Sequence, residues 1–361
     1  MSTVRFVAIH PSSMPDAPSR LFASDNASGV HPRYLAAIDR VNAGHALAYG
    51  QDAATRDANS LFGELSGRPI EVLFTFGGTG ANVLALACLL GRAESIVCTE
   101  WAHIAVDETG APERALGVKL QTYPAPDGKL RVEHIEAAVH ALGNVHHAQP
   151  GVVSISQPTE MGTLYSVDEI REICDAAHRH GLRVHLDGAR IGNAVAVLGA
   201  NRQVFRSMTF DAGVDAVSFG GTKNAMLNAE AVLLSGVDQT RRAQYLRKQV
   251  GQLPSKMRYT SAQFVEALSD DLWIQTAAAA NSSASALYDA LKDVASLHLA
   301  APVVNSLYPT LPDPHRSRLQ EWSFFWDWDL SRDQVRWMTS WDTDDDDIQR
   351  FVAGVRHVID R

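Results

Sequence analysis

Short apolar runs alternate along much of the chain with segments whose apolar residues recur at helical spacing. Such runs, bounded by turn residues, are typical of buried strands, and the longer periodic segments are typical of helices. The pattern predicts strands at residues 71–76, 95–99, 118–123, 152–156, 183–187, 214–218 and 230–235. Strands that alternate with helices indicate an α/β fold with a mostly parallel sheet covered on both faces.

The clearest predicted helix covers residues 167–180 and has both of its ends marked. Ser166 and Glu169 form a capping box at its start, and Gly181 follows its last periodic residue. Apolar residues from Val167 to Ala177 share one face, so this helix is expected to pack on the sheet.

The last third of the chain predicts a second, smaller domain. The alanine-rich segment 273–291 reads as a long connecting helix. Near the end, WSFFWDWDL predicts a half-buried strand whose alternating aromatic residues are Trp322, Phe324, Trp326 and Trp328. We expect an N-terminal arm, a large domain and a smaller α+β C-terminal domain, with limits at residues 1–20, 21–250 and 251–361.

An acidic run at residues 342–347 precedes the periodic segment 348–358. Aspartates in this position more often begin and cap a helix than hold a metal ion. The adjacent His146 and His147 have no partner at metal-ligand spacing. We therefore expect no metal site.

Composition narrows the class of protein. A chain of 361 residues with 32 Lys+Arg and 41 Asp+Glu has a formal net charge of −9, which argues against a nucleic-acid partner. Cys88, Cys98 and Cys174 stand singly, as reduced core residues do. The N-terminus lacks a signal-peptide pattern, and no segment approaches the ~20 apolar residues of a membrane span. We expect a soluble, cytoplasmic protein without a membrane partner.

Two polar residues with candidate chemistry each follow a predicted strand. Asp187, in HLDGAR, follows the carboxyl end of a predicted strand, and α/β sheets bind ligands in the crevice at these ends. Taken alone, Asp187 could equally well be a residue that caps the next turn. Lys223 follows Gly220, Gly221 and Thr222. A lysine held at a strand end beside a cationic cofactor ring can act as an amine nucleophile, but this segment alone favours an ordinary surface lysine.

A third candidate, TFGGTGANVLAL, combines a strand, a glycine-rich turn and a helix that opens near Thr79. Backbone N–H groups at such a helix end bind phosphate. The segment lacks the spacing of a dinucleotide fingerprint, and the turn before Lys223 lacks the ending of a P-loop, so nucleotide alternatives lose support. An anion site, an aspartate and a lysine in this order match the needs of pyridoxal 5′-phosphate: an anchor, a pyridinium partner and an amine.

At these residues the chain resembles the low-specificity L-threonine aldolases of the β-eliminating lyase superfamily, in the aspartate-aminotransferase-like (fold type I) class. The resemblance runs along nearly the whole chain, through ASDNASGVHPRYLAAI, YGQDAATR, GGTGANVLAL, AHIAVDETGAPE, QPTEMGTLYS, HLDGARIGNA, SFGGTKN, SKMRYTSAQ and VRWMTSWD. It implies cleavage of L-threonine and related β-hydroxy-α-amino acids to glycine and an aldehyde, with pyridoxal phosphate as cofactor, in a homodimer or homotetramer.

Two alternatives stay open. Another β-eliminating lyase or amino-acid enzyme would share the cofactor chemistry. A non-catalytic relative would keep the fold alone, but the intact Lys223 and Asp187 argue against it.

The resemblance also implies roles for individual residues. It makes Lys223 the lysine that carries the cofactor and Asp187 the partner of the pyridine nitrogen, while His103 stacks on the ring. The phosphate would be bound by Gly78, Thr79 and Gly80. The cofactor or substrate would further be contacted by Arg190, Ser24 and Arg336 of the same subunit and by Arg258 and Tyr49 of the neighbouring subunit.

Glu160, in QPTEMG, stands where many family members have a second histidine. This departure puts a two-histidine mechanism in doubt and changes the assignment of the base more than the reaction. A histidine titrates near neutrality and an ordinary glutamate does not, so we expect His103 to contribute more to turnover than Glu160.

Overall fold

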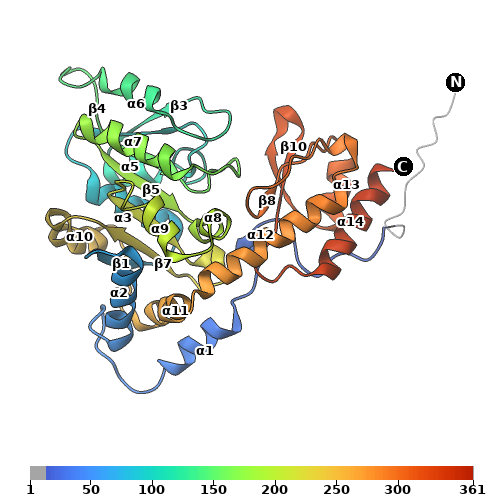
Figure 1. The fold of residues 1–361 in the computed structure, drawn as a ribbon, viewed down its shortest axis with the longest axis horizontal. Coiled ribbons are helices and arrows are strands. Elements are labelled where there is room, and N and C mark those ends of the chain that lie inside the picture. The colour runs from blue at the N-terminus through green and yellow to red at the C-terminus, as the bar shows by residue number, and fades with distance from the viewer. Residues whose placement is uncertain (1–13, 361) are drawn as a thin grey trace. The chain divides into compact units, whose positions relative to one another are not determined.

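The computed structural model describes residues 14–360, except for the side chains of residues 237–241. The chain divides into two compact units (Figure 1): a large one, Gly29–Ala279, and a small one that combines the segment before Gly29 with Ala280–Arg361. The domain limits expected from the sequence, at 20/21 and 250/251, stay a prediction. Most of the predicted N-terminal arm lies outside the described residues.

The large unit is built on a seven-stranded sheet in the order β1-β7-β6-β5-β4-β2-β3. Pairs among β2 to β6 are parallel, whereas β7 runs antiparallel to both β1 and β6. The strands are β1 (Glu71–Thr75), β2 (Glu94–Thr99), β3 (Lys119–Tyr123), β4 (Gln149–Ser156), β5 (Arg183–Gly188), β6 (Ala216–Gly220) and β7 (Glu230–Leu234).

All seven predicted strands are present, but the prediction for β6 was displaced by two residues. Val214 is buried and apolar, yet it precedes the strand, because the core here extends beyond the hydrogen-bonded ladder. The strand consequently ends at Gly220, close to Lys223 along the chain.

Helices cover both faces of this sheet (Figure 1). On one face α3 packs with α5 and α10, and on the other α6, α7 and α9 pack in sequence. The helix α3 is apolar nearly all round because it lies between the sheet and its neighbouring helices. The helices are α1 (Pro32–Arg40), α2 (Ala53–Ser66), α3 (Gly78–Leu89), α4 (His103–Val106), α5 (Ala111–Leu116), α6 (Val132–Val139), α7 (Val167–Arg179), α8 (Ile191–Leu198), α9 (Arg202–Met208), α10 (Val237–Gln249) and α11 (Arg258–Ser269).

The helix α7 has the predicted ends. Ser166 accepts a hydrogen bond from the backbone N–H of Glu169, whose carboxylate accepts one from the N–H of Ser166. Gly181 follows with a φ of 77°, a left-handed conformation that glycine adopts without steric cost. These local interactions explain why the boundaries of α7 can be read from the sequence.

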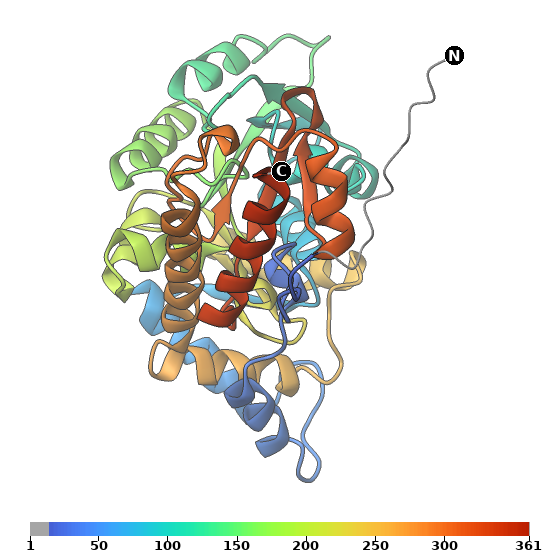
Figure 2. The ribbon, with the colours of Figure 1, turned by 90° about the vertical axis from the view of Figure 1, so that its right-hand side faces the viewer.

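The small unit has a three-stranded antiparallel sheet in the order β8-β10-β9, seen in red and orange in Figure 2. Phe22, Phe325, Trp337 and Phe351 meet in its core. Its elements are β8 (Ser306–Leu307), β9 (Trp326–Asp329), β10 (Gln334–Met338), α13 (His315–Trp322), α14 (Asp345–Ile359) and the end of α12 (Leu272–Leu291), which is the predicted connecting helix.

The strand predicted from alternating aromatic residues was wrong in its start and in its buried face. The helix α13 ends at Trp322, and β9 begins only at Trp326. Phe325 is fully buried, whereas Phe324 is 41% and Trp326 53% exposed. Phe325 packs against Trp337 and Phe351, so contacts with β10 and α14 decide which aromatic ring enters the core.

The acidic run starts α14, as predicted: Asp344 accepts a hydrogen bond from the N–H of Asp347. Within residues 14–360, no three His, Cys, Asp or Glu side chains are arranged to hold a metal ion. No helix in the same range is both long and apolar enough to cross a membrane. The three cysteines are buried and free.

Asp347 is expected to contribute stability that depends on pH. Its buried carboxylate accepts hydrogen bonds from Ser19 and Arg20 at 2.6 to 3.1 Å. Burial alone would raise the pKa of Asp347, but these bonds outweigh burial and lower it to about 2. Because the folded pKa is depressed, the contribution is present above the unfolded value of about 3.9 and is lost as the pH falls towards 2.

Asp347→Asn should therefore cost about 2 kcal/mol of unfolding free energy at pH 7, measured by urea denaturation. The cost should shrink between pH 4 and pH 2. Asp346→Asn is the matched control, because Asp346 is exposed and pairs only with Arg350 on the described surface, so it should cost less than about 1 kcal/mol. Equal costs for the two variants would contradict this account of Asp347.

Candidate active site

The carboxyl ends of β4, β5 and β6 and the start of α3 meet around a small pocket in the large unit. Its volume is only about 50 Å³, so its chemistry and not its size singles it out. Six predicted site residues line it together, although they are spread from position 78 to position 223. The lining residues are Gly78, Asn82, His103, Ser156, Pro158, Thr159, Glu160, Asp187, Ala189, Arg190 and Lys223.

The first turn of α3 forms an anion cradle beside the Gln252 side chain. Gly77 is the N-cap and, having no side chain, caps none of the N–H groups of this turn, to which Gly78, Thr79 and Gly80 contribute. A Cβ atom at Gly77 or Gly78 would meet nothing within 4 Å, whereas one at Gly80 would lie 2.3 Å from the side chain of Gln252. The backbone donors and the positive end of the helix dipole suit a phosphate group.

Asp187 is a buried carboxylate at the end of β5. Its Oδ1 accepts a hydrogen bond from the N–H of Ala189 at 2.9 Å, and its Oδ2 accepts one from Asn82 Nδ2 at 2.8 Å. Burial alone would raise the pKa of Asp187, but the charges of His103 and Lys223 and the bond from Ala189 hold it below its usual value. The pocket therefore contains an ionised carboxylate that can pair with a cationic N–H group.

His103 is tied to Asp187 through two other side chains. The Nδ1 atom of His103 lies 2.8 Å from Oε1 of the buried Glu108. Asn82 Nδ2 donates to the same Glu108 oxygen at 2.9 Å, and it also donates to Asp187. Because Glu108 accepts at Nδ1, Nε2 is the nitrogen that can take up a proton in the neutral ring. Burial alone would lower the pKa of His103, but Glu108 and Asp187 raise it overall.

Glu160 lies beside the backbone of His103. Its Oε1 accepts hydrogen bonds from the N–H of His103 at 2.8 Å and from Ser156 Oγ at 2.7 Å. Protein surrounds the carboxyl on most sides, and this burial, with the nearby charge of Asp187, raises its pKa. The pocket thus holds two groups with raised pKa values, and either has the chemistry of a base.

Lys223 lies in the turn after β6, in the short helix η3 (Thr222–Asn224). A Cβ atom at Gly220 would come within 2.2 Å of the carbonyl oxygen of Ala189, and one at Gly221 within 2.4 Å of that of Ala229. Both glycines are required by this close approach of backbone segments. The turn they form brings Lys223 into the same pocket as Asp187.

A family model for beta-eliminating lyases matches residues 22–311. The chain belongs to the beta-eliminating lyase family. The low specificity L-threonine aldolase of Pseudomonas aeruginosa is 39% identical to it over 342 residues, which cover 94% of this chain and 97% of that protein. The solved threonine aldolase of Leishmania major is 33% identical with a TM-score of 0.86, and the match covers 94% of this chain and 99% of that one.

An aspartate aminotransferase of Rhodobacter sphaeroides shares the fold at 18% identity, with a TM-score of 0.68 over 97% of this chain and 95% of its own. The predicted aspartate-aminotransferase-like α/β fold and the predicted family resemblance are thereby confirmed. The roles of individual residues in this beta-eliminating lyase stay predictions.

Tyr49 and Arg258 belong to one surface of the large unit. The N–H of Tyr49 donates to the carbonyl of Ser255 at 2.9 Å, and Arg258 begins α11 shortly after. Neither is among the described residues that line the pocket. Ser24 and Arg336 belong to the small unit: Ser24 caps the short helix η2 (Asp25–Ala27), and the Arg336 guanidinium lies 5.2 Å from the Trp328 ring centre.

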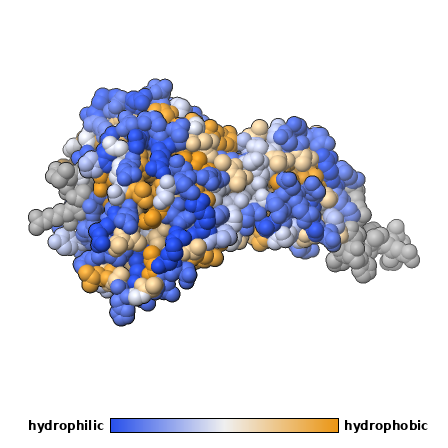
Figure 3. All heavy atoms as spheres, turned by 60° about the horizontal axis from the view of Figure 1, so that its bottom comes forward, coloured by the Kyte–Doolittle hydropathy of each residue, from blue (hydrophilic) through white to orange (hydrophobic). Residues whose placement is uncertain are grey.

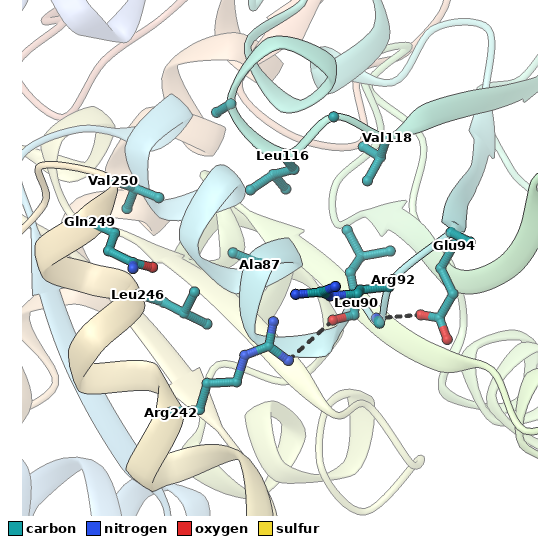
Figure 4. A pocket seen from close by; sticks show the side chains of 14 residues that line it. Ala87, Leu90, Arg92, Glu94, Leu116, Val118, Arg242, Leu246, Gln249 and Val250 are labelled. Carbon is teal, nitrogen blue, oxygen red and sulfur yellow. Dashed lines mark hydrogen bonds between the residues drawn. The ribbon is translucent and has the colours of Figure 1, made fainter.

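A second cavity of this beta-eliminating lyase, of about 700 Å³, is larger but lies by the amino end of β2, whereas the first pocket lies at the carboxyl ends of the strands. Figure 4 shows the side chains that line it. It lies among the end of α3, the start of β2 and the helix α10. Arg242 donates to the carbonyl of Leu90, and Glu94 accepts from the N–H of Gly91 at 2.6 Å, so these charged groups hold local backbone.

Sequence reasoning assigned no role to Asn82 or Glu108, which connect His103 with Asp187. Glu108 had a detectable signal, because it lies five residues after His103 in the AHIAVDE motif. Asn82 had a weaker one: it is a polar residue in the middle of an otherwise apolar helix.

Proposed function

We propose that this protein is a low-specificity L-threonine aldolase that depends on pyridoxal 5′-phosphate. It would cleave L-threonine, L-allo-threonine and related β-hydroxy-α-amino acids to glycine and an aldehyde, and would work in the cytoplasm. The observation that carries the proposal is the pocket, in which Lys223, an ionised Asp187 and an uncapped helix start meet. The identity to the Pseudomonas aeruginosa enzyme supports the reaction.

The residues fit the cofactor group by group. The N–H groups of Gly78, Thr79 and Gly80 would bind its phosphate, since the N-cap residue Gly77 has no side chain to bind them. The buried Asp187 would hold the protonated ring nitrogen, and Lys223 would carry the cofactor covalently. When bound, pyridoxal phosphate supplies an electron-withdrawing ring that accepts the electron pair left at Cα as a bond to this carbon breaks.

The remaining steps belong to side chains of this chain. His103 Nε2 or the Glu160 carboxylate would accept the proton of the substrate's β-hydroxyl group, whose loss allows the Cα–Cβ bond to break and the aldehyde to leave. The family resemblance assigns the substrate carboxylate to Arg336, because a guanidinium group can form two parallel hydrogen bonds to it. Arg190, which lines the pocket, would lie beside the cofactor ring and the substrate.

The direct test is a product assay with L-threonine, L-allo-threonine and a panel of other β-hydroxy-α-amino acids. We expect equal amounts of glycine and aldehyde from several of them. Release of ammonia and a keto acid without glycine would instead identify a β-eliminating enzyme, and the aldolase proposal would be wrong.

We further propose that the active unit is a homodimer or a homotetramer in which Tyr49 and Arg258 act in the neighbour's site. Tyr49 is 51% exposed, as an interface residue of an isolated chain would be. Figure 3 turns the bottom of Figure 1 towards the viewer. On this face of the large unit, hydrophobic residues lie among hydrophilic ones. In the proposed assembly a second subunit would cover apolar groups of the large unit.

Mixing two inactive variants tests this sharing of sites. Arg258→Ala keeps its own Lys223, and Lys223→Ala keeps its own Arg258, so a mixed dimer would contain one complete site. After the subunits are exchanged at equal concentrations, about a quarter of wild-type activity should return for statistically formed dimers. No recovery, or a fully active monomer in sedimentation, would refute the proposal.

A further inference from the structure

Glu230 is a buried carboxyl group for which the proposed mechanism has no use. It begins β7 and is only 5% exposed. A buried carboxyl group costs free energy unless polar partners compensate for the lost water, so its partners indicate what it does.

The partners of Glu230 belong to the turn that carries Lys223. The N–H of Gly221 donates to Glu230 Oε2 at 3.1 Å, and the N–H of Thr222 lies 3.4 Å from Oε1. The side chain of Thr222 also binds the residue just before β7, because the N–H of Ala229 donates to Thr222 Oγ1 at 3.1 Å. Both oxygens of one carboxylate therefore hold the two residues that precede Lys223.

The charge environment of Glu230 connects it to Lys223 as well. Burial raises the pKa of Glu230 to about 7. The hydrogen bonds from Gly221 and Thr222 and the positive charge of Lys223 lower this pKa, but they do not outweigh burial. Of the elements that pack most closely on β7, α3 and β6 have no charged residue, and the one in β1, Glu71, is at the far end of that strand. From β1 the facing residue is Thr75, whose buried Oγ1 has no hydrogen-bond partner among the described residues.

We propose that Glu230 is a positioning residue for Lys223: its carboxylate holds the Gly221–Thr222 turn, and its negative charge stabilises the protonated Lys223 amine. The inference rests on the proposed function in that Lys223 is taken as the lysine that carries the cofactor. The charges of Asp187 and His103 also act on Lys223, but the Glu230 variants leave both residues in place, so the effect of Glu230 is measurable without turnover.

The test measures how fast the amine of Lys223 is modified at each pH. Full-length protein freed of pyridoxal phosphate is reductively methylated between pH 6 and pH 10, and the Lys223 peptide is quantified by mass spectrometry. Exposed Lys119 serves as the internal reference. Only the neutral amine reacts, so Glu230→Gln, which removes the charge, should move the midpoint of Lys223 modification down by about one pH unit. Glu230→Asp should keep it near that of the wild type.

Asp215→Asn is the matched control. Asp215 is also a buried carboxylate that accepts a backbone N–H, that of Val184 at 2.8 Å, but it precedes the opposite end of β6. It should leave the midpoint unchanged. An unchanged midpoint in Glu230→Gln, or an equal shift in Asp215→Asn, would overturn the proposal.

Hydrogen exchange of the wild-type protein provides a test that needs no variant to fold. The amides of Gly221 and Thr222 should exchange slowly compared with that of Val145, whose residue is 90% exposed in a loop. Equal exchange would refute the holding role of Glu230. A failure of the proposed function would be recognised separately, because the product assay with L-threonine and the position of the borohydride label report it without any change at Glu230.

Discussion

Lys223→Ala is expected to remove both the bound-cofactor colour and turnover. The side chain lies in a turn of closely packed backbone at the edge of the pocket, and no other lysine is among the described residues that line it. Loss of the residue that bonds covalently to its reaction partner typically lowers kcat by on the order of 10⁴- to 10⁶-fold. Visible absorbance of the purified variant and a glycine-release assay measure the two effects.

Borohydride reduction of the wild-type protein, followed by peptide mapping, identifies the modified lysine directly. The label should be on the peptide that contains Lys223. Asp187→Asn is the control, because it neutralises the ring partner yet leaves the amine in place, so any cofactor it retains should still be trapped on Lys223. A label on a different lysine would show that the central assignment of the site is mistaken.

His103→Phe should lower kcat by roughly 10²- to 10⁴-fold, the usual contribution of a general base, and Glu160→Gln should lower it less. Phenylalanine keeps a flat ring for stacking but cannot accept a proton. Glu160 already accepts hydrogen bonds from the His103 backbone and Ser156, and this use as an acceptor favours a structural role. His103 instead has its Nδ1 fixed by Glu108, which leaves Nε2 for the substrate.

The pH profile separates the two groups. The pKa of His103 is raised above its ordinary value of about 6.5. The neutral ring, which can accept a proton, therefore becomes the main form only above this pH. The rate should rise with it in the wild type and in Glu160→Gln. His147→Phe, in an exposed loop, is the control and should behave as the wild type. If Glu160→Gln shows the large loss and His103→Phe does not, the glutamate is the base.

Features that depend on neighbours along the chain could be predicted from the sequence. The ends of α7 follow from Ser166, Glu169 and Gly181, which interact within one helical turn. The starts of α3 and α14 follow likewise from local glycine and aspartate residues. The order of strand ends then predicted that Asp187 and Lys223 lie in one crevice, because parallel strands end at the same edge of a sheet.

Features that depend on packing between distant segments were decided by the tertiary structure alone. The aromatic run before β9 alternates as a strand would, but the side chain that enters the core is Phe325, because Trp337 and Phe351 contact it from other elements. Asn82 and Asp187 are 105 positions apart, and only the packing of α3 on the sheet makes them hydrogen-bond partners. A buried polar group must find its partner in space, and sequence spacing does not determine which distant residue supplies it.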